Sequence, residues 1–236
     1  MSNKLLNVIK QNARTIMVPT SIGEIEITEF TVRQLKKILA LTNIEDPNKV
    51  LMGLIYILDE SVMTPGVSLR DLPSIDIERI YLALNRIQRG DVVKMDLVCG
   101  HCEKEFAGDV NLGVVGQSCE PVTEIKLDSD LVFQMRQPTM LESILVGEST
   151  DDYFNVALRC ITAVDTGTEV LQVGEDKDLS PEELEEVIEY LDSGSLGKLF
   201  DFIERIPTVV VHAPIACPYC SAKDVLHLSG IAEIME

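Results

Sequence analysis

The chain has 236 residues, of which 46% are hydrophobic and 25% charged, and its formal net charge is −19. This composition predicts a folded chain with its own core, and it excludes wholesale disorder or a small scaffold held only by disulfides. The negative charge disfavours nucleic acid and anionic membrane surfaces as partners. The apolar runs are too short for a membrane span and the first residues lack signal-peptide features, so we expect a cytoplasmic protein.

The acidic charge is concentrated in the C-terminal part. Residues 1–94 carry 12 Lys and Arg against 11 Asp and Glu, whereas residues 95–236 carry 8 against 28, a net charge of −20. Such acidity favours solubility, and it also fits a face that binds a basic protein partner.

The N-terminal part predicts a hairpin and three helices. Residues 16–18 and 22–27 are rich in isoleucine and valine on either side of a turn, which is typical of two short strands. Thr31 begins a helix that runs to about residue 41, Asp46-Pro47 begins a second, and Ser74 begins a third that Gly90 ends.

From residue 92 the pattern changes from helical to extended. Strands are predicted over residues 92–98, 105–112, 122–127 and 131–136. The apolar spacing over residues 153–164 then predicts a helix.

Two amphipathic helices are predicted near the C-terminus, followed by two strands at 209–211 and 225–228. The first helix opens on Ser180-Pro181-Glu182-Glu183, a capping box with proline at the first helical position. Helical spacing predicts that one apolar face of each helix points inward. The residues of these faces are Leu184, Val187, Ile188, Leu191, Leu196, Leu199, Phe200 and Ile203.

These elements predict an α+β fold that is mainly helical, with a small zinc-ribbon-like β subdomain formed by two distant Cys-x-x-Cys turns. The predicted regions are an N-terminal hairpin and helices over residues 1–90, the β subdomain over 91–137 and 206–236, and an inserted acidic helical region over 138–205.

The two turns contain Cys99, Cys102, Cys217 and Cys220. A redox site would place each pair at the start of a helix in a thioredoxin-like fold, but residues 103–111 are poor helix formers and few residues follow Cys220. A structural Zn²⁺ ion needs four thiolates on two tight turns between strands. Although 114 residues separate the two pairs, the pairs can still meet around one ion if these residues form an insertion whose two ends lie close together. Zinc is therefore favoured over reduced thiols without metal and over redox catalysis.

The remaining cysteines and the histidines are weaker ligand candidates. Cys119 and Cys160 are interpreted as a loop thiol and a core residue, and His212 and His227 as ordinary strand residues. His101 could replace one thiolate, although four cysteines already suffice. The sequence has no P-loop, no dinucleotide-binding glycine motif and no hydrolase or metalloprotease motif, so no catalytic or cofactor-binding residue is assigned.

Several segments resemble one viral family when they are taken in order. These are Glu29-Phe30-Thr31-Val32-Arg33-Gln34-Leu35, Leu97-Val98-Cys99-Gly100-His101-Cys102-Glu103-Lys104-Glu105-Phe106, Phe133-Gln134-Met135-Arg136-Gln137-Pro138-Thr139 and Cys217-Pro218-Tyr219-Cys220 before Leu226-His227-Leu228-Ser229-Gly230-Ile231. Together they are similar to baseplate hub and hub-assembly proteins of T4-like contractile-tailed bacteriophages.

The resemblance implies a non-enzymatic component or assembly chaperone of the baseplate hub. Such a protein would act in the host cytoplasm and would bind other hub proteins or the tape-measure protein. As a hub component, it would also be retained in the baseplate of the virion tail. Two alternatives stay open: a zinc-ribbon interaction module of another complex, and a Cys-x-x-Cys thiol oxidoreductase.

Overall fold

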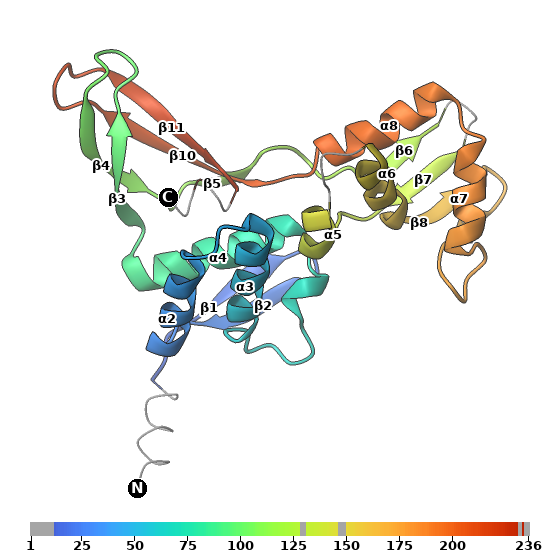
Figure 1. The fold of residues 1–236 in the computed structure, drawn as a ribbon, viewed down its shortest axis with the longest axis horizontal. Coiled ribbons are helices and arrows are strands. Elements are labelled where there is room, and N and C mark those ends of the chain that lie inside the picture. Colours follow the sequence, from blue (N-terminus) through green and yellow to red (C-terminus); the bar gives the residue numbers. More distant parts are fainter. Residues whose placement is uncertain (1–11, 128–130, 146–149, 231–232, 234–236) are drawn as a thin grey trace, which may run out of the picture. The chain divides into compact units, whose positions relative to one another are not determined.

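The structure, a computed structural model, describes residues 12–127, 131–145, 150–230 and 233. The chain divides into two compact units, the second inserted into the first (Figure 1). The first unit is Met1–Ser118 together with Thr208–Glu236, and the second unit is Cys119–Pro207.

The first unit begins with an antiparallel hairpin and three helices. The hairpin joins β1 (Thr15–Thr20) to β2 (Gly23–Thr28). The helices are α2 (Val32–Leu41), α3 (Pro47–Asp59) and α4 (Ser74–Arg89), with the 3-10 helix η1 (Leu69–Asp71) before α4. The side chains of Thr31 and Asp46 accept backbone N–H bonds at the starts of α2 and α3. These elements confirm the hairpin and helices predicted from the sequence.

Two buried carboxylates at the start of α4 hold separate segments of the first unit together. Asp76 accepts hydrogen bonds from the Ser21 N–H and hydroxyl, at 2.9 and 2.6 Å. Glu78 accepts the Val209 N–H at 2.6 Å. Because Ser21 lies in the β1–β2 turn and Val209 begins strand β10 (Val209–Ala216), α4 connects the first hairpin to the C-terminal strands.

The rest of the first unit consists of strands, and two of its hairpins carry the cysteine turns. β3 (Val92–Val98) pairs with β4 (Glu105–Asn111), and β10 pairs with β11 (Lys223–Ser229) on one side and β5 (Val115–Gln117) on the other. All of these pairings are antiparallel. Figure 1 shows the β3–β4 and β10–β11 hairpins side by side. They share a core with α4 made of Ile75, Leu82, Leu97, Val110, Leu112, Val209, Val211, Ala213 and Leu228.

The chain leaves and re-enters the first unit at one place. The Ser118 N–H donates to the Thr208 carbonyl at 2.9 Å, and the Thr208 N–H donates to the Ser118 hydroxyl at 3.0 Å. Gln117 and Val209 are also register partners in the β5–β10 pair. The long insertion therefore does not separate the two cysteine-bearing hairpins in space.

The second unit combines a four-stranded antiparallel sheet with four helices. The strand order is β6 (Glu124–Lys126), β7 (Val132–Met135), β8 (Ile161–Asp165) and β9 (Val170–Gln172). The helices are α5 (Met140–Leu145), α6 (Thr150–Arg159), α7 (Pro181–Glu189) and α8 (Ser193–Glu204). Side chains of the sheet, α6, α7 and α8 form one core, with Phe133 and Phe202 at 0% and 2% exposure.

The expectation of a mainly helical chain is wrong. Helix accounts for 37% and strand for 31% of the described residues, and the described strands form four antiparallel sheets. Part of the error lies at residues 161–164, which were predicted to continue a helix but form β8. Three of these residues are β-branched and suit a strand: Ile161, Thr162 and Val164. Strand β8 also pairs with a neighbouring strand along each edge, β7 on one and β9 on the other.

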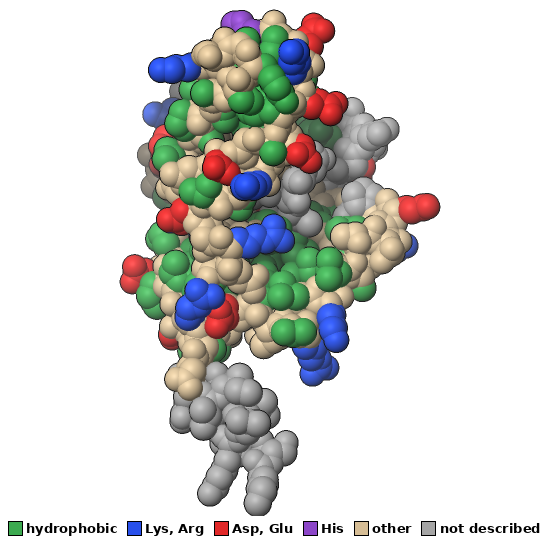
Figure 2. Space-filling view, turned by 90° about the vertical axis from the view of Figure 1, so that its left-hand side faces the viewer, with side chains coloured by type: hydrophobic (Ala, Val, Ile, Leu, Met, Phe, Trp, Pro, Cys, Tyr) green, Lys and Arg blue, Asp and Glu red, His purple; other side chains and the backbone are tan. Residues whose placement is uncertain are grey.

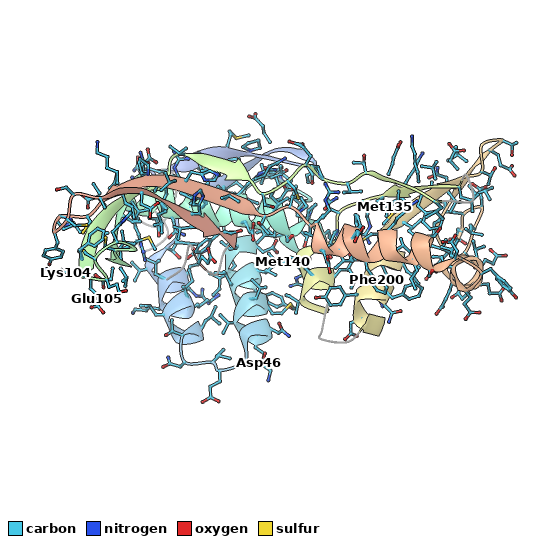
Figure 3. The ribbon with its side chains drawn as sticks, turned by 90° about the horizontal axis from the view of Figure 1, so that it is seen from above. Asp46, Lys104, Glu105, Met135, Met140 and Phe200 are labelled. Atoms are coloured by element: carbon cyan, nitrogen blue, oxygen red, sulfur yellow. The ribbon has the colours of Figure 1, made fainter. Side chains whose placement is uncertain are left out.

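The predicted inward faces of the two C-terminal helices are only partly correct. The buried members are Leu184, Ile188, Leu199 and Ile203. Val187 is exposed, Phe200 is half-buried on α8 (Figure 3), and Phe202 occupies the core in its place.

Among the described residues, no helix has the length and apolar character needed to cross a membrane.

Candidate metal centre

The first cysteine turn joins β3 to β4 through residues 99–104. The Cys99 N–H donates to the Lys104 carbonyl at 3.0 Å, and the Glu103 N–H donates back to the Cys99 carbonyl at 2.8 Å. Glu103 has a positive φ of 57°, which turns the chain toward β4. Cys99 and Cys102 therefore stand on one tight, hydrogen-bonded turn.

The second turn repeats this construction between β10 and β11. The Cys217 N–H donates to the Ala222 carbonyl at 2.9 Å, the Ser221 N–H donates to the Cys217 carbonyl at 2.9 Å, and Ser221 has a φ of 60°. In both turns the first cysteine follows the last strand residue directly, and the next strand begins three residues after the second cysteine. The chain thus builds the same turn twice, from unrelated intervening residues.

The four sulfur atoms form a compact cluster. They lie within 4.8 Å of one another, and the Sγ atoms are 3.6 Å apart for Cys99 and Cys220 and 3.7 Å apart for Cys102 and Cys217. Zinc bound tetrahedrally at about 2.3 Å from each sulfur has sulfur–sulfur edges of about 3.8 Å. The two recorded contacts match such edges, and each joins one turn to the other, so the donor set fits a Zn²⁺ ion held equally by both hairpins.

Backbone N–H groups of the turns direct positive dipoles at the sulfurs. The N–H of His101 lies 3.4 Å from the Cys99 Sγ, and the N–H of Tyr219 lies 3.4 Å from the Cys217 Sγ. The N–H groups of Cys102 and His101 hold the pKa of the Cys99 thiol below its ordinary value. Hydrogen bonds of this kind stabilise thiolates, which are the form that binds a metal.

The second turn shows how strongly the four thiols influence one another. Burial works to raise the pKa of Cys217, but the N–H groups of Cys220 and Tyr219 outweigh it and lower the pKa to about 6. The pKa of Cys220 is raised to about 12, because burial and hydrogen bonds to the other sulfurs exceed the lowering effect of the Ala222 N–H. Negative charge on one sulfur opposes ionisation of the next, and a bound dication removes that opposition.

A contact outside the cluster also joins the turns. The ammonium group of Lys104, which lies with Glu105 at the end of the β3–β4 hairpin (Figure 3), is 5.0 Å from the centre of the Tyr219 ring. This is a cation–π distance. Sequence reasoning missed this contact because Lys104 and Tyr219 are distant in the chain.

The structure brings together Cys99, Cys102, Cys217 and Cys220, the four residues predicted from the sequence. Within the described part of the chain, they are the one group of three or more such ligands close enough to share an ion. Cys119 and Cys160 belong to the second unit and lie outside the cluster.

The two strand histidines also lie outside the cluster. His212 and His227 are register partners on β10 and β11, and their Nδ1 atoms are 2.8 Å apart. This cross-strand contact was not anticipated, although the alternation of residues along two predicted strands is the signal that would have placed both side chains on one face.

The local structure does not suit a redox pair. A low-pKa redox cysteine uses the N-terminus of a helix, whereas both turns here lead into strands, β4 and β11. The two recorded sulfur contacts also run between the turns. These features favour a shared ion over disulfide chemistry within one turn.

Comparison with known proteins identifies a family for this chain. The family described as T4 bacteriophage base plate protein matches residues 11–236, which is nearly the whole chain. No curated protein and no solved structure matches the chain.

Proposed function

We propose that this chain, which belongs to the T4 bacteriophage base plate protein family, is a component or assembly chaperone of the baseplate hub that acts by binding other tail proteins. The observation that carries the proposal is the family match over residues 11–236, which includes both cysteine turns and the whole inserted unit. The protein would act in the host cytoplasm during tail assembly and take its place in the virion tail.

The four cysteines serve this function by holding one structural zinc ion. A zinc ion with four thiolates has no open position for a substrate or a reactive water, so its role is to stabilise the fold. Here it would fix two hairpins that come from opposite ends of the insertion. The filled coordination shell and the absence of catalytic sequence motifs both support a protein without catalytic turnover.

The inserted unit carries most of the chain's negative charge. Residues 119–207 carry 21 Asp and Glu against six Lys and Arg, a net charge of −15, whereas the rest of the chain has 18 against 14, a net charge of −4. A field of this strength attracts basic segments of other proteins and accelerates their association. Hub proteins and the tape-measure protein are the candidate partners.

A phage that lacks the gene tests this function. We expect electron micrographs of infected cells to show few complete tails, with tail formation restored by the wild-type gene and not by Cys217→Ser. A Cys119→Ser gene, which leaves the cluster intact, should restore tails. Normal tails in the absence of the gene would contradict the proposal. Robust disulfide-reductase activity of the purified protein that Cys217→Ser abolishes would also contradict it.

A further inference from the structure

Helix α2 presents an apolar face to solvent. Val32, Leu35 and Leu39 are 70%, 37% and 67% exposed, and their spacing places them along one side of the helix. Arg33 and Lys36 are exposed beside them, and α2 has no acidic residue. Figure 2 views the molecule from the left-hand side of Figure 1, which is the side where α2 lies. Hydrophobic side chains gather in the lower half of this view, with Lys and Arg side chains beside them.

Helix α7 has an exposed face of the opposite charge. Tyr190, the residue that caps its C-terminus, is 90% exposed, and Val187 one turn earlier is 36% exposed. Glu186 and Glu189 are exposed next to them, and α7 carries five glutamates and no basic residue. An exposed tyrosine among carboxylates is a suitable anchor for an apolar and basic partner surface.

We propose that the α2 face of one copy of this chain binds the α7 face of a second copy. Each face combines exposed apolar side chains with charged side chains of one sign, and the two signs are opposite, which is the complementarity that selects one partner over another. Residues 1–11 are a poor alternative occupant of the α2 face, because they contain two lysines and no acidic residue. The inference does not rest on the proposed hub function, since the purified protein alone tests it.

The contact joins different surfaces of the two copies. Each bound pair therefore leaves one α2 face and one α7 face available, so further copies add in sequence or close into a ring. Two single-helix faces make a small interface, which places the association among weak and salt-sensitive ones.

Sedimentation velocity over a range of protein concentrations measures the association. We expect the average mass to rise above the 26.2 kDa of one chain as concentration increases at low salt, and to fall back at high salt. Two variants remove one charge face each: Arg33→Glu with Lys36→Glu, and Glu186→Lys with Glu189→Lys. Each should weaken association at least roughly tenfold, and Tyr190→Ser should do the same. The matched controls, Lys49→Glu with Lys94→Glu and Glu175→Lys with Asp176→Lys, make equal charge changes at other exposed sites and should associate like the wild type.

Mixing the two charge-face variants gives the decisive result. Each variant alone should associate much more weakly than the wild type, whereas the mixture should associate, because the new glutamates on α2 of one variant then meet the new lysines on α7 of the other. Circular dichroism checks that both variants are folded. A wild-type chain that stays at 26.2 kDa at every concentration, control variants that weaken association equally, or a mixture that stays monomeric would overturn the inference.

Discussion

Glu103 and Ser221 occupy equivalent positions in the two cysteine turns, each directly after a second cysteine and each with a positive φ, at 57° and 60°. Both N–H groups return to the carbonyl of the first cysteine in their turn, Cys99 or Cys217. The backbone of both turns is therefore set by local geometry, independently of the ion that the four sulfurs are proposed to hold.

A β-branched residue at either position should strain its turn. We expect Ser221→Val to lower the free energy of unfolding by about 1–2 kcal/mol, because a left-handed conformation is costly for such a residue, whereas Ser221→Gly should stay close to the wild type. Urea unfolding followed by circular dichroism measures both. Equal stabilities for the two variants would show that the turn is not left-handed.

Removing one sulfur should release the metal and loosen both hairpins. We expect Cys217→Ser to lose zinc and to lower the melting temperature by roughly 10 °C or more, because the binding free energy of a structural zinc ion contributes to folding. Metal analysis and calorimetry of the purified variant measure the two effects. Cys119→Ser is the control, since this thiol donates to the Arg205 carbonyl in the second unit and should keep its zinc. Unchanged zinc content in Cys217→Ser would contradict the assignment.

The ion pair between Arg136 and Glu142 should make the second unit sensitive to acid. The Nη1 and Nη2 atoms of Arg136 each donate to one carboxylate oxygen of Glu142, at 2.7 and 2.6 Å. Burial works to raise the pKa of Glu142, but Arg136 and the Thr139 N–H outweigh it and hold the pKa below its ordinary value of 4.5. The pair therefore stabilises the fold above about pH 4.5, and this contribution is lost as the pH falls through the lower folded value.

Glu142→Gln isolates this effect. We expect it to cost about 1 kcal/mol at neutral pH and to differ progressively less from the wild type as the pH falls through the lowered pKa of Glu142, because the wild-type side chain then also loses its charge. Glu169→Gln, at an exposed site outside this pair, serves as the control. A stability difference that stays constant from neutral pH to acid would show that the loss comes from packing alone.

Phe202 and Phe200 should differ in their contribution to stability. Phe202 is 2% exposed within the core of the second unit, whereas Phe200 is half-buried. We expect Phe202→Ala to cost about 3–5 kcal/mol and Phe200→Ala about 1–2 kcal/mol. Denaturant unfolding of both variants measures the difference. Equal losses of stability would contradict the assignment of Phe202, rather than Phe200, to the core.

Local signals in the sequence located the helix starts well. Thr31, Asp46 and Ser180 each cap the helix they were predicted to begin, because a capping hydrogen bond involves residues only two or three positions apart. The inward face of α8 was harder to predict. Phe200 and Phe202 both lie near the edge of its apolar stripe, and the choice between them depends on the sheet and on α6, which pack against the same core.

The misassigned strand β8 has a related cause. Cys160, Ile161 and Val164 continue the apolar spacing of α6, so periodicity alone could not separate helix from strand. Pairing with β7 and β9 decides the outcome, and that pairing is not visible in one segment.

The cysteine cluster was predictable because metal chemistry restricts the arrangement. Two Cys-x-x-Cys turns in extended surroundings can supply four thiolates, whatever the length of chain between them. The hydrogen bonds between Ser118 and Thr208 that close the insertion, and the contact between Lys104 and Tyr219, depend on residues far apart in the sequence and carry no comparable pattern.

Zinc X-ray absorption of the purified protein tests the central claim most directly, that both turns hold one ion through four thiolates. The account predicts one zinc per chain with four sulfur neighbours at about 2.3 Å and no nitrogen or oxygen neighbour. A protein that contains no zinc, or a zinc ion with a histidine nitrogen in place of one sulfur, would contradict it.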